Sequence, residues 1–279
     1  MQKTRLDILM ESRGLSPSRS QAQRLIMAGS VRVNHQVVLK PGTKVDPGDT
    51  IEISESPRFV SRGGEKLLSA LQAFHLTSLA DRVCVDVGAS TGGFTDCLLQ
   101  HGAKKVFAVD VGYGVLDWKI RNDTRVVVME KQNARYITTF HEPIDLVVID
   151  ASFISLRTLL PVVRQWLNAP KGEVVALIKP QFEAGRSETA RGSGVIRDPE
   201  IHRAVLRQVL EFAQKEGYTA EGLIRSPLTG PKGNIEFLAH LIYPGETPAD
   251  VERLIEGLPW NEGTTADQPC QPEPEGKLK

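Results

Sequence analysis

The chain has few cysteines, no long apolar run and no excess of either charge, and these absences exclude several classes of protein. It holds three cysteines, Cys84, Cys97 and Cys270, which show no C-x-x-C or metal-ligand spacing. No disulfide framework and no metal site are therefore expected, and a reducing, cytoplasmic location is predicted. No uninterrupted stretch of about 18 apolar residues occurs, so no membrane span is predicted. The start, MQKTRLDILMESRGLSPSRS, has charges within its short apolar run, which argues against an export signal.

Positive and negative charges balance overall but are unevenly distributed. The 279 residues include 34 Lys and Arg and 34 Asp and Glu, yet through Arg62 there are ten basic residues against six acidic ones. With 41% hydrophobic and 24% charged positions, the chain is expected to be a soluble protein with a full core and room for a small second domain. No internal repeat is evident.

The first 50 residues are predicted to form a compact module of two short helices followed by short strands. RLDILMES is closed by Gly14, and Ser16 with Pro17 is a cap and first-turn pair for a second helix that runs through Met27 and is terminated by Gly29. The following SVRVNHQVVLKPGTKVDPGDTIEI alternates apolar and polar residues, which is typical of strands.

From about residue 65 onward, apolar strands alternate with helices. A helix is expected over 65–74, and others over 92–101, 155–167 and 199–216. Such alternation favours an α/β fold with a mostly parallel sheet covered on both faces. The last two of seven apolar runs, AEGLIRS and NIEFLAHLIY, are joined only by PLTGPKG. This link is too short for a helical crossover, so the seventh strand is predicted to be antiparallel to the sixth.

A glycine-rich turn follows the first strand of this region, in VCVDVGASTGGFTDCLL. Its spacing is G-x-x-x-G-G, whereas dinucleotide-binding turns have G-x-G-x-x-G, so a nicotinamide-dependent dehydrogenase is disfavoured. Asp86, facing the pocket, would repel a pyrophosphate and suit a cationic ligand such as S-adenosylmethionine. Asp110, at the end of the second strand, can bind both ribose hydroxyls, and Asn133 can meet the adenine edge.

The predicted cofactor-binding residues are therefore Asp86, Gly88, Ala89, Ser90, Thr91, Gly92, Gly93, Phe94, Asp110 and Asn133. The alternative is that Gly88 and Gly93 only permit tight packing and that Asp110 is a helix cap.

Several longer motifs resemble known proteins. VDVGASTGGFTDCLL is similar to the cofactor loop of FtsJ-type ribose methyltransferases. Together with FVSRGGEKL, DLVVIDASFISL, LIKPQFE and GPKGNIEFL, it resembles the hemolysin A (TlyA) family over residues 4–243. The resemblance implies an N-terminal RNA-binding module of the ribosomal-protein S-four type, a Rossmann-like class I methyltransferase fold, and methylation of ribose hydroxyls of cytidines in ribosomal RNA.

The resemblance also implies a catalytic tetrad of Lys66, Asp150, Lys179 and Glu236. The residues agree, because Asp150 and Lys179 end the fourth and fifth strands, and catalytic groups lie at the carboxyl ends of parallel strands. Glu236 lies beside those ends if the seventh strand runs backwards. For each residue alone, a solvated surface charge is the alternative.

Transfer of a methyl group to a hydroxyl is an in-line displacement in which the oxygen must lose its proton. Our hypothesis makes Lys179 the base, because burial and a neighbouring cation can bring a lysine into the range useful at neutral pH. Lys66 then favours the neutral form of Lys179 or stabilises developing oxyanion charge, and Asp150 and Glu236 orient the lysines. The DASF segment, with Ser152 and Phe153, departs from the N/D-P-P-Y/F/W pattern of amino-methylating enzymes, which favours an oxygen acceptor.

Basic residues of the first module and the connector are the predicted phosphate contacts. They are Lys3, Arg5, Arg19, Arg24 and Arg62. An ordinary solvated surface is the alternative.

The predicted organisation is an RNA-binding domain over 1–56, a connector over 57–63, a methyltransferase domain over 64–260 and a polar, disordered tail over 261–279. Two other functions compete with an rRNA methyltransferase: a non-catalytic ribosome assembly factor, which the intact tetrad disfavours, and a membrane-active haemolysin, for which no basic amphipathic helix of the interfacial kind is evident.

Overall fold

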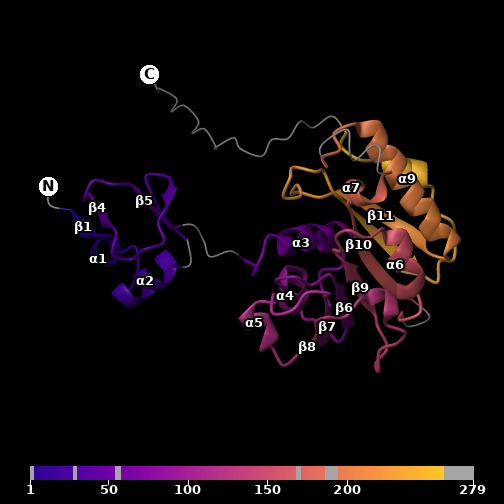
Figure 1. Cartoon of the computed structure of the whole chain (residues 1–279), viewed down its shortest axis with the longest axis horizontal. Coiled ribbons are helices and arrows are strands. Elements are labelled where there is room, and N and C mark those ends of the chain that lie inside the picture. Colours follow the sequence, from indigo (N-terminus) through magenta and orange to yellow (C-terminus); the bar gives the residue numbers. More distant parts are fainter. Residues whose placement is uncertain (1–2, 28–29, 54–57, 168–170, 186–193, 261–279) are drawn as a thin grey trace, which may run out of the picture. The chain divides into compact units, whose positions relative to one another are not determined.

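The computed structural model describes residues 3–27, 30–53, 58–167, 171–185 and 194–260. The chain forms two compact units, Met1–Val60 and Ser61–Lys279, whose boundary falls inside the connector predicted over 57–63 (Figure 1). The predicted disordered tail, together with Cys270, lies outside the described residues. No helix in the described ranges is long and apolar enough to cross a membrane.

The first unit contains the two expected helices and short antiparallel strand pairs, but one strand, β1 (Thr4–Arg5), precedes the helices. Helices α1 (Leu6–Ser12) and α2 (Arg19–Met27) pack on each other. Strand β2 (Val31–Val33) pairs with β3 (Gln36–Val37) and β5 (Ile51–Ile53), and β1 (Thr4–Arg5) pairs with β4 (Lys44–Val45). The core of this unit consists of Leu6, Leu9, Met10, Ala22, Ile26, Val31, Val33 and Val45.

The second helix begins later than predicted. Ser18, not the Ser16-Pro17 pair, caps it, because the Ser18 hydroxyl accepts a hydrogen bond from the Gln21 N–H at 3.2 Å. The Ser16 hydroxyl instead donates to the Ser18 carbonyl at 2.9 Å. Both serines are followed by candidate helix formers, so the sequence alone did not distinguish the two caps.

The second unit is built on a seven-stranded sheet in the order β11-β12-β10-β9-β6-β7-β8. Five neighbouring strands are parallel: β8 (Val126–Met129), β7 (Lys105–Val109), β6 (Val83–Val87), β9 (Leu146–Ile149) and β10 (Gly172–Ile178). Strand β12 (Phe237–Tyr243) is antiparallel to both β10 and β11 (Thr219–Arg225). The prediction of a reversed seventh strand is confirmed.

Helices cover both faces of this sheet because side chains of each buried strand alternate between the faces. One face packs against α6 (Leu156–Val163), α9 (Pro199–Lys215) and α10 (Val251–Glu256), with Val85, Val147 and Val174 in a common core. Helix α4 (Gly93–Gln100) follows the glycine turn and packs on α3 (Gly63–Ala73), away from α6 and α9 (Figure 1). The predicted start of α3 at residue 65 is two residues late, so the last connector residue, Gly63, already belongs to the helix.

The strand register brings chemistry-bearing residues to one edge. Gly88, Asp110, Asp150 and Lys179 each follow the last residue of β6, β7, β9 or β10. Ile178 lies opposite Phe237 in the antiparallel β10–β12 pair, so Glu236, just before β12, is at this same edge. Because β12 runs antiparallel to β10, the Glu236 side chain at the start of β12 lies beside the C-terminal ends of the parallel strands.

Candidate active site

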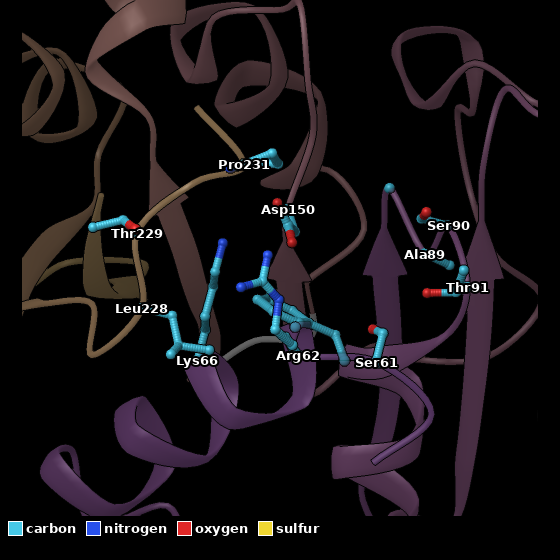
Figure 2. Close-up of a pocket in the computed structure, with 14 residues that line it drawn as sticks. Ser61, Arg62, Lys66, Ala89, Ser90, Thr91, Asp150, Leu228, Thr229 and Pro231 are labelled. Carbon is cyan, nitrogen blue, oxygen red and sulfur yellow. The ribbon is translucent and has the colours of Figure 1, made fainter. Parts of the chain in front are cut away.

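Two neighbouring cavities lie at this edge of the sheet. The smaller, of about 230 Å³, is lined by Lys66 and Arg62 near the start of α3, by the glycine turn, by Asp150 and by Leu228, Thr229 and Pro231 (Figure 2). The larger, of about 470 Å³, is lined by residues that follow β6, β7, β8 and β9. Gly88, Ser90 and Asp150 line both cavities, so a group held in one is adjacent to a group held in the other.

Asp110 is fixed in the wall of the larger cavity by two backbone donors. Its Oδ2 accepts from the Ser90 N–H at 2.8 Å, and its Oδ1 accepts from the Gly112 N–H at 2.6 Å. Each carboxylate oxygen has a further lone pair for a ligand hydroxyl. Asn133 lines the same cavity and accepts from the Arg135 N–H at 3.1 Å.

The glycine turn both packs tightly and forms part of the cavity walls. Gly88 has φ +86°, and a Cβ there would lie 2.7 Å from the Asp150 carbonyl oxygen. A Cβ on Gly93 would lie 2.2 Å from the Ser61 hydroxyl. Ala89, Ser90, Thr91 and Phe94 line the smaller cavity with these glycines, whereas Gly92 lines neither and faces Leu116 and Ile120.

Asp86 lines neither of these two cavities, in contrast to the prediction that it faces the ligand. It is fully buried on the sheet face covered by α4, where its Oδ2 accepts from the Thr95 hydroxyl at 2.6 Å. Its Oδ1 has no hydrogen-bond partner among the described residues. Burial raises the pKa of Asp86 to about 7, although the hydrogen bond from Thr95 opposes this. The structure thus places this carboxylate beneath the turn, where it anchors the start of α4.

We expect the Asp86→Asn substitution to flatten the pH dependence of stability. Because the pKa of Asp86 is raised in the folded state, the contribution of Asp86 to stability is fully present below about pH 4 and is lost as the pH rises through about 7. Asparagine has nearly the same shape and does not titrate. Melting temperatures from pH 4.5 to 8 should therefore fall more steeply for the wild type than for the variant, and parallel curves would contradict the assignment.

The four tetrad residues form two ion pairs. Lys179 Nζ is 2.5 Å from Asp150 Oδ1 and 3.0 Å from the Ser152 hydroxyl, to which it donates. Lys66 Nζ donates to Glu236 Oε2 at 2.5 Å. Lys66, Lys179 and Glu236 are buried, and Asp150 is partly exposed in both cavities. Buried charges of this kind are stable only when paired, which accounts for the matched lysines and carboxylates.

Two residues beside this site, Ser152 and Glu183, have no role predicted from the sequence. The Ser152 hydroxyl accepts a hydrogen bond from the Lys179 amine. Glu183, at the end of α7 (Pro180–Glu183), accepts hydrogen bonds from Ser155 and Leu156, which follow the Asp150 loop. Glu183 belongs to the motif LIKPQFE, but its proximity to that loop required the fold.

The predicted RNA contacts are distributed over both units. Arg62 is exposed on the rim of the smaller cavity. In the first unit, Arg5 and Arg19 both donate to the buried carboxylate of Asp7, which keeps the pKa of that carboxyl well below its usual range. Lys3 lies 3.6 Å from Asp46, and Arg24 donates to Gln21 at 2.6 Å.

Across the part of the chain that the structure describes, no cluster of His, Cys, Asp and Glu could hold a metal ion.

Two family models match the chain. The FtsJ-like methyltransferase model matches residues 59–243, and the S4 domain model matches residues 4–51. Among curated relatives, a provisionally named rRNA methyltransferase of Bacillus subtilis, YqxC, is 51% identical over 88% of this chain and 87% of its own length. The 16S/23S rRNA (cytidine-2'-O)-methyltransferase TlyA of Mycobacterium tuberculosis is 44% identical over 86% of this chain and 90% of its own. A solved structure from Streptococcus thermophilus, provisionally described as a hemolysin, has a TM-score of 0.69 and 45% identity, covering 92% of this chain and 95% of that one.

Proposed function

Because the chain belongs to the FtsJ-like methyltransferase family, among relatives named TlyA and hemolysin A, we propose that it methylates ribosomal RNA. The reaction is transfer of the methyl group of S-adenosylmethionine to a ribose 2'-hydroxyl. The proposed nucleotide is cytidine, because the names of the TlyA relatives specify it. The observation that carries the proposal is that Asp150 lines both cavities and is paired with the buried Lys179 amine, 2.5 Å away.

The larger cavity fits S-adenosylmethionine. Its volume of about 470 Å³ is within the range of small-molecule sites. Asp110, held by two backbone N–H groups, suits the ribose hydroxyls, and Asn133 suits the edge of the adenine. Gly88, which lines this cavity, packs so closely on the Asp150 carbonyl that a side chain there would push the turn and the Asp150 loop apart. When bound, the cofactor supplies an electrophilic methyl group on a sulfonium.

The smaller cavity is the proposed acceptor site, and the lysines provide its chemistry. In its neutral form, Lys179 would take the proton from the ribose hydroxyl, so that the oxygen can form its bond to the methyl carbon while the bond from that carbon to the sulfonium breaks. Asp150, 2.5 Å away, balances the positive charge that the lysine gains. Lys66, held by Glu236, stabilises negative charge on the oxygen.

Ribosomal RNA is the proposed partner, and the first unit is its proposed binding module. Support comes from the match of residues 4–51 to the S4 domain and from the basic residues of this unit. Arg62, exposed on the rim of the acceptor cavity, is placed to contact a phosphate near the target nucleotide. Since the substrate is ribosomal RNA, we place the reaction in the cytoplasm.

The test is transfer of tritiated methyl from S-adenosylmethionine to small and large ribosomal subunits that lack the modification, followed by mapping of the labelled nucleotide. We expect label on a cytidine 2'-hydroxyl. Label on a base amine would contradict the proposed acceptor. No label on either subunit, while calorimetry detects cofactor binding, would contradict the enzyme and favour a non-catalytic assembly factor.

A further inference from the structure

A buried carboxylate links the segment after Lys179 to the segment after Asp150. Lys179 is followed at once by α7, and the last residue of that helix, Glu183, is only 6% exposed. Its Oε2 accepts from the Ser155 hydroxyl at 2.5 Å, and its Oε1 accepts from the Leu156 N–H at 2.6 Å. Both oxygens thus bond to the start of α6, the helix that the loop from Asp150 enters.

Arg157, whose side chain is partly exposed, also contacts Glu183. Its guanidinium donates to the Glu183 carbonyl at 3.3 Å and lies 3.7 Å from the Glu183 carboxylate. Burial raises the pKa of Glu183, while the hydrogen bonds from Ser155 and Leu156 oppose that effect. Two hydrogen-bond donors, together with the Arg157 guanidinium 3.7 Å away, fix the position of this carboxylate.

The loop that Glu183 holds requires such support. Phe153 has φ +64°, a left-handed conformation that is unfavourable for a bulky residue, and its side chain is 90% exposed. Its ring is 5.0 Å from that of Phe182 on α7, the residue before Glu183. The same loop supplies Asp150 and Ser152, the two residues that hold the Lys179 amine.

We propose that Glu183 is a positioning residue for methyl transfer. By bonding Ser155 and Leu156, it fixes the Asp150 loop against the segment that carries Lys179, and so sets the direction of the Lys179 amine. This inference rests on the proposed function, in which Lys179 is the base. It goes beyond the tetrad, because Glu183 acts through Asp150, Ser152 and Lys179 and not on the substrate.

The test compares Glu183→Gln with Glu173→Gln in the full-length protein. Glu173 lies on β10, is also buried and also holds two partners, Arg82 and His240, but it lies near the opposite end of the strand. Glutamine keeps the size of either side chain and removes its charge. Tritiated methyl transfer to ribosomal subunits gives kcat and KM, calorimetry gives the Kd for S-adenosylmethionine, and thermal melting reports folding.

We expect Glu183→Gln to lower kcat about tenfold or more, since small misplacements of reacting groups have effects of that size. Its cofactor Kd should change by less than about twofold. Glu173→Gln should lower the melting temperature comparably and leave kcat near the wild-type value. Unchanged kcat in Glu183→Gln, or an equal loss in both variants, would overturn the inference. An inactive wild type would instead contradict the proposed function.

A double-mutant cycle with Ser155→Ala identifies the contact. Ser155→Ala removes the same hydrogen bond from the other side, so the Glu183→Gln/Ser155→Ala double variant should lose little more kcat than the more affected single variant. Fully additive losses would show that the two residues act independently and would overturn the proposed contact.

Discussion

Replacement of Lys179 by alanine should lower kcat for methyl transfer by about 10²- to 10⁴-fold, the usual contribution of a positioned base. The amine is buried and bonded to Ser152 and to Asp150, the residue that lines both cavities. Its loss leaves the ribose hydroxyl with no group to take its proton. Cofactor binding should remain, because Lys179 lines neither cavity directly. Single-turnover methyl transfer with saturating cofactor measures the loss.

The Lys179→Arg variant tests whether Lys179 acts as a base or only supplies a positive charge. Arginine can keep an ion pair with Asp150, but it does not deprotonate in proteins, so it cannot serve as the base. We therefore expect Lys179→Arg to be nearly as inactive as the alanine variant. Lys66→Arg is the matched control, because the role proposed for Lys66 needs only positive charge, and this variant should retain more activity. Near-normal turnover in Lys179→Arg would show that another group takes the proton.

Gly88→Ala should abolish cofactor binding, with a rise in Kd of at least about a hundredfold. The residue has φ +86°, and an added Cβ would lie 2.7 Å from the Asp150 carbonyl oxygen and 3.2 Å from the Ala151 Cα, both backbone atoms. These atoms cannot rotate away, so the turn and the Asp150 loop must separate. Since Gly88 lines both cavities, this movement deforms both sites. Calorimetry with S-adenosylmethionine measures the change.

Gly233→Ala is the matched control for the backbone conformation. Gly233 has the same φ of +86°, but a Cβ there would meet nothing within 4 Å. This variant therefore has the conformational cost of alanine in the left-handed region, roughly 1 kcal/mol, without the steric clash. Its Kd for the cofactor should be close to that of the wild type. Equal weakening in both variants would mean that conformational strain, and not the close approach at Gly88, determines cofactor binding.

The alternation of apolar strands and helices was sufficient to predict the α/β sheet, because this pattern is local and repeats along the chain. The short link between the last two strands also predicted that β12 is reversed. The predicted ends of helices were less accurate than the predicted fold. The start of α2 depended on which of two serines supplied the cap, and in the structure it is Ser18 that accepts the capping hydrogen bond.

Contacts between distant segments could not be predicted in the same way. Asp86 was expected to face a ligand, but strand residues alternate between two faces, and only the packing of α4 showed that this carboxylate is covered. Glu183 was not assigned a role, because α7 and the start of α6 are separated in sequence and meet only in the fold. The sequence likewise did not indicate which carboxylate pairs with which lysine.

The sequence by itself determined the fold class and the family, since periodicity, turn chemistry and motifs are properties of consecutive residues. The family resemblance supplied the four residues of the proposed tetrad. Only the tertiary structure decided the pairing of Lys179 with Asp150 and of Lys66 with Glu236, the burial of Asp86, and the link from Glu183 to the Asp150 loop. The physical reason is that a buried polar group must find its partner across the sheet or between helices, and strand register and helix packing select that partner.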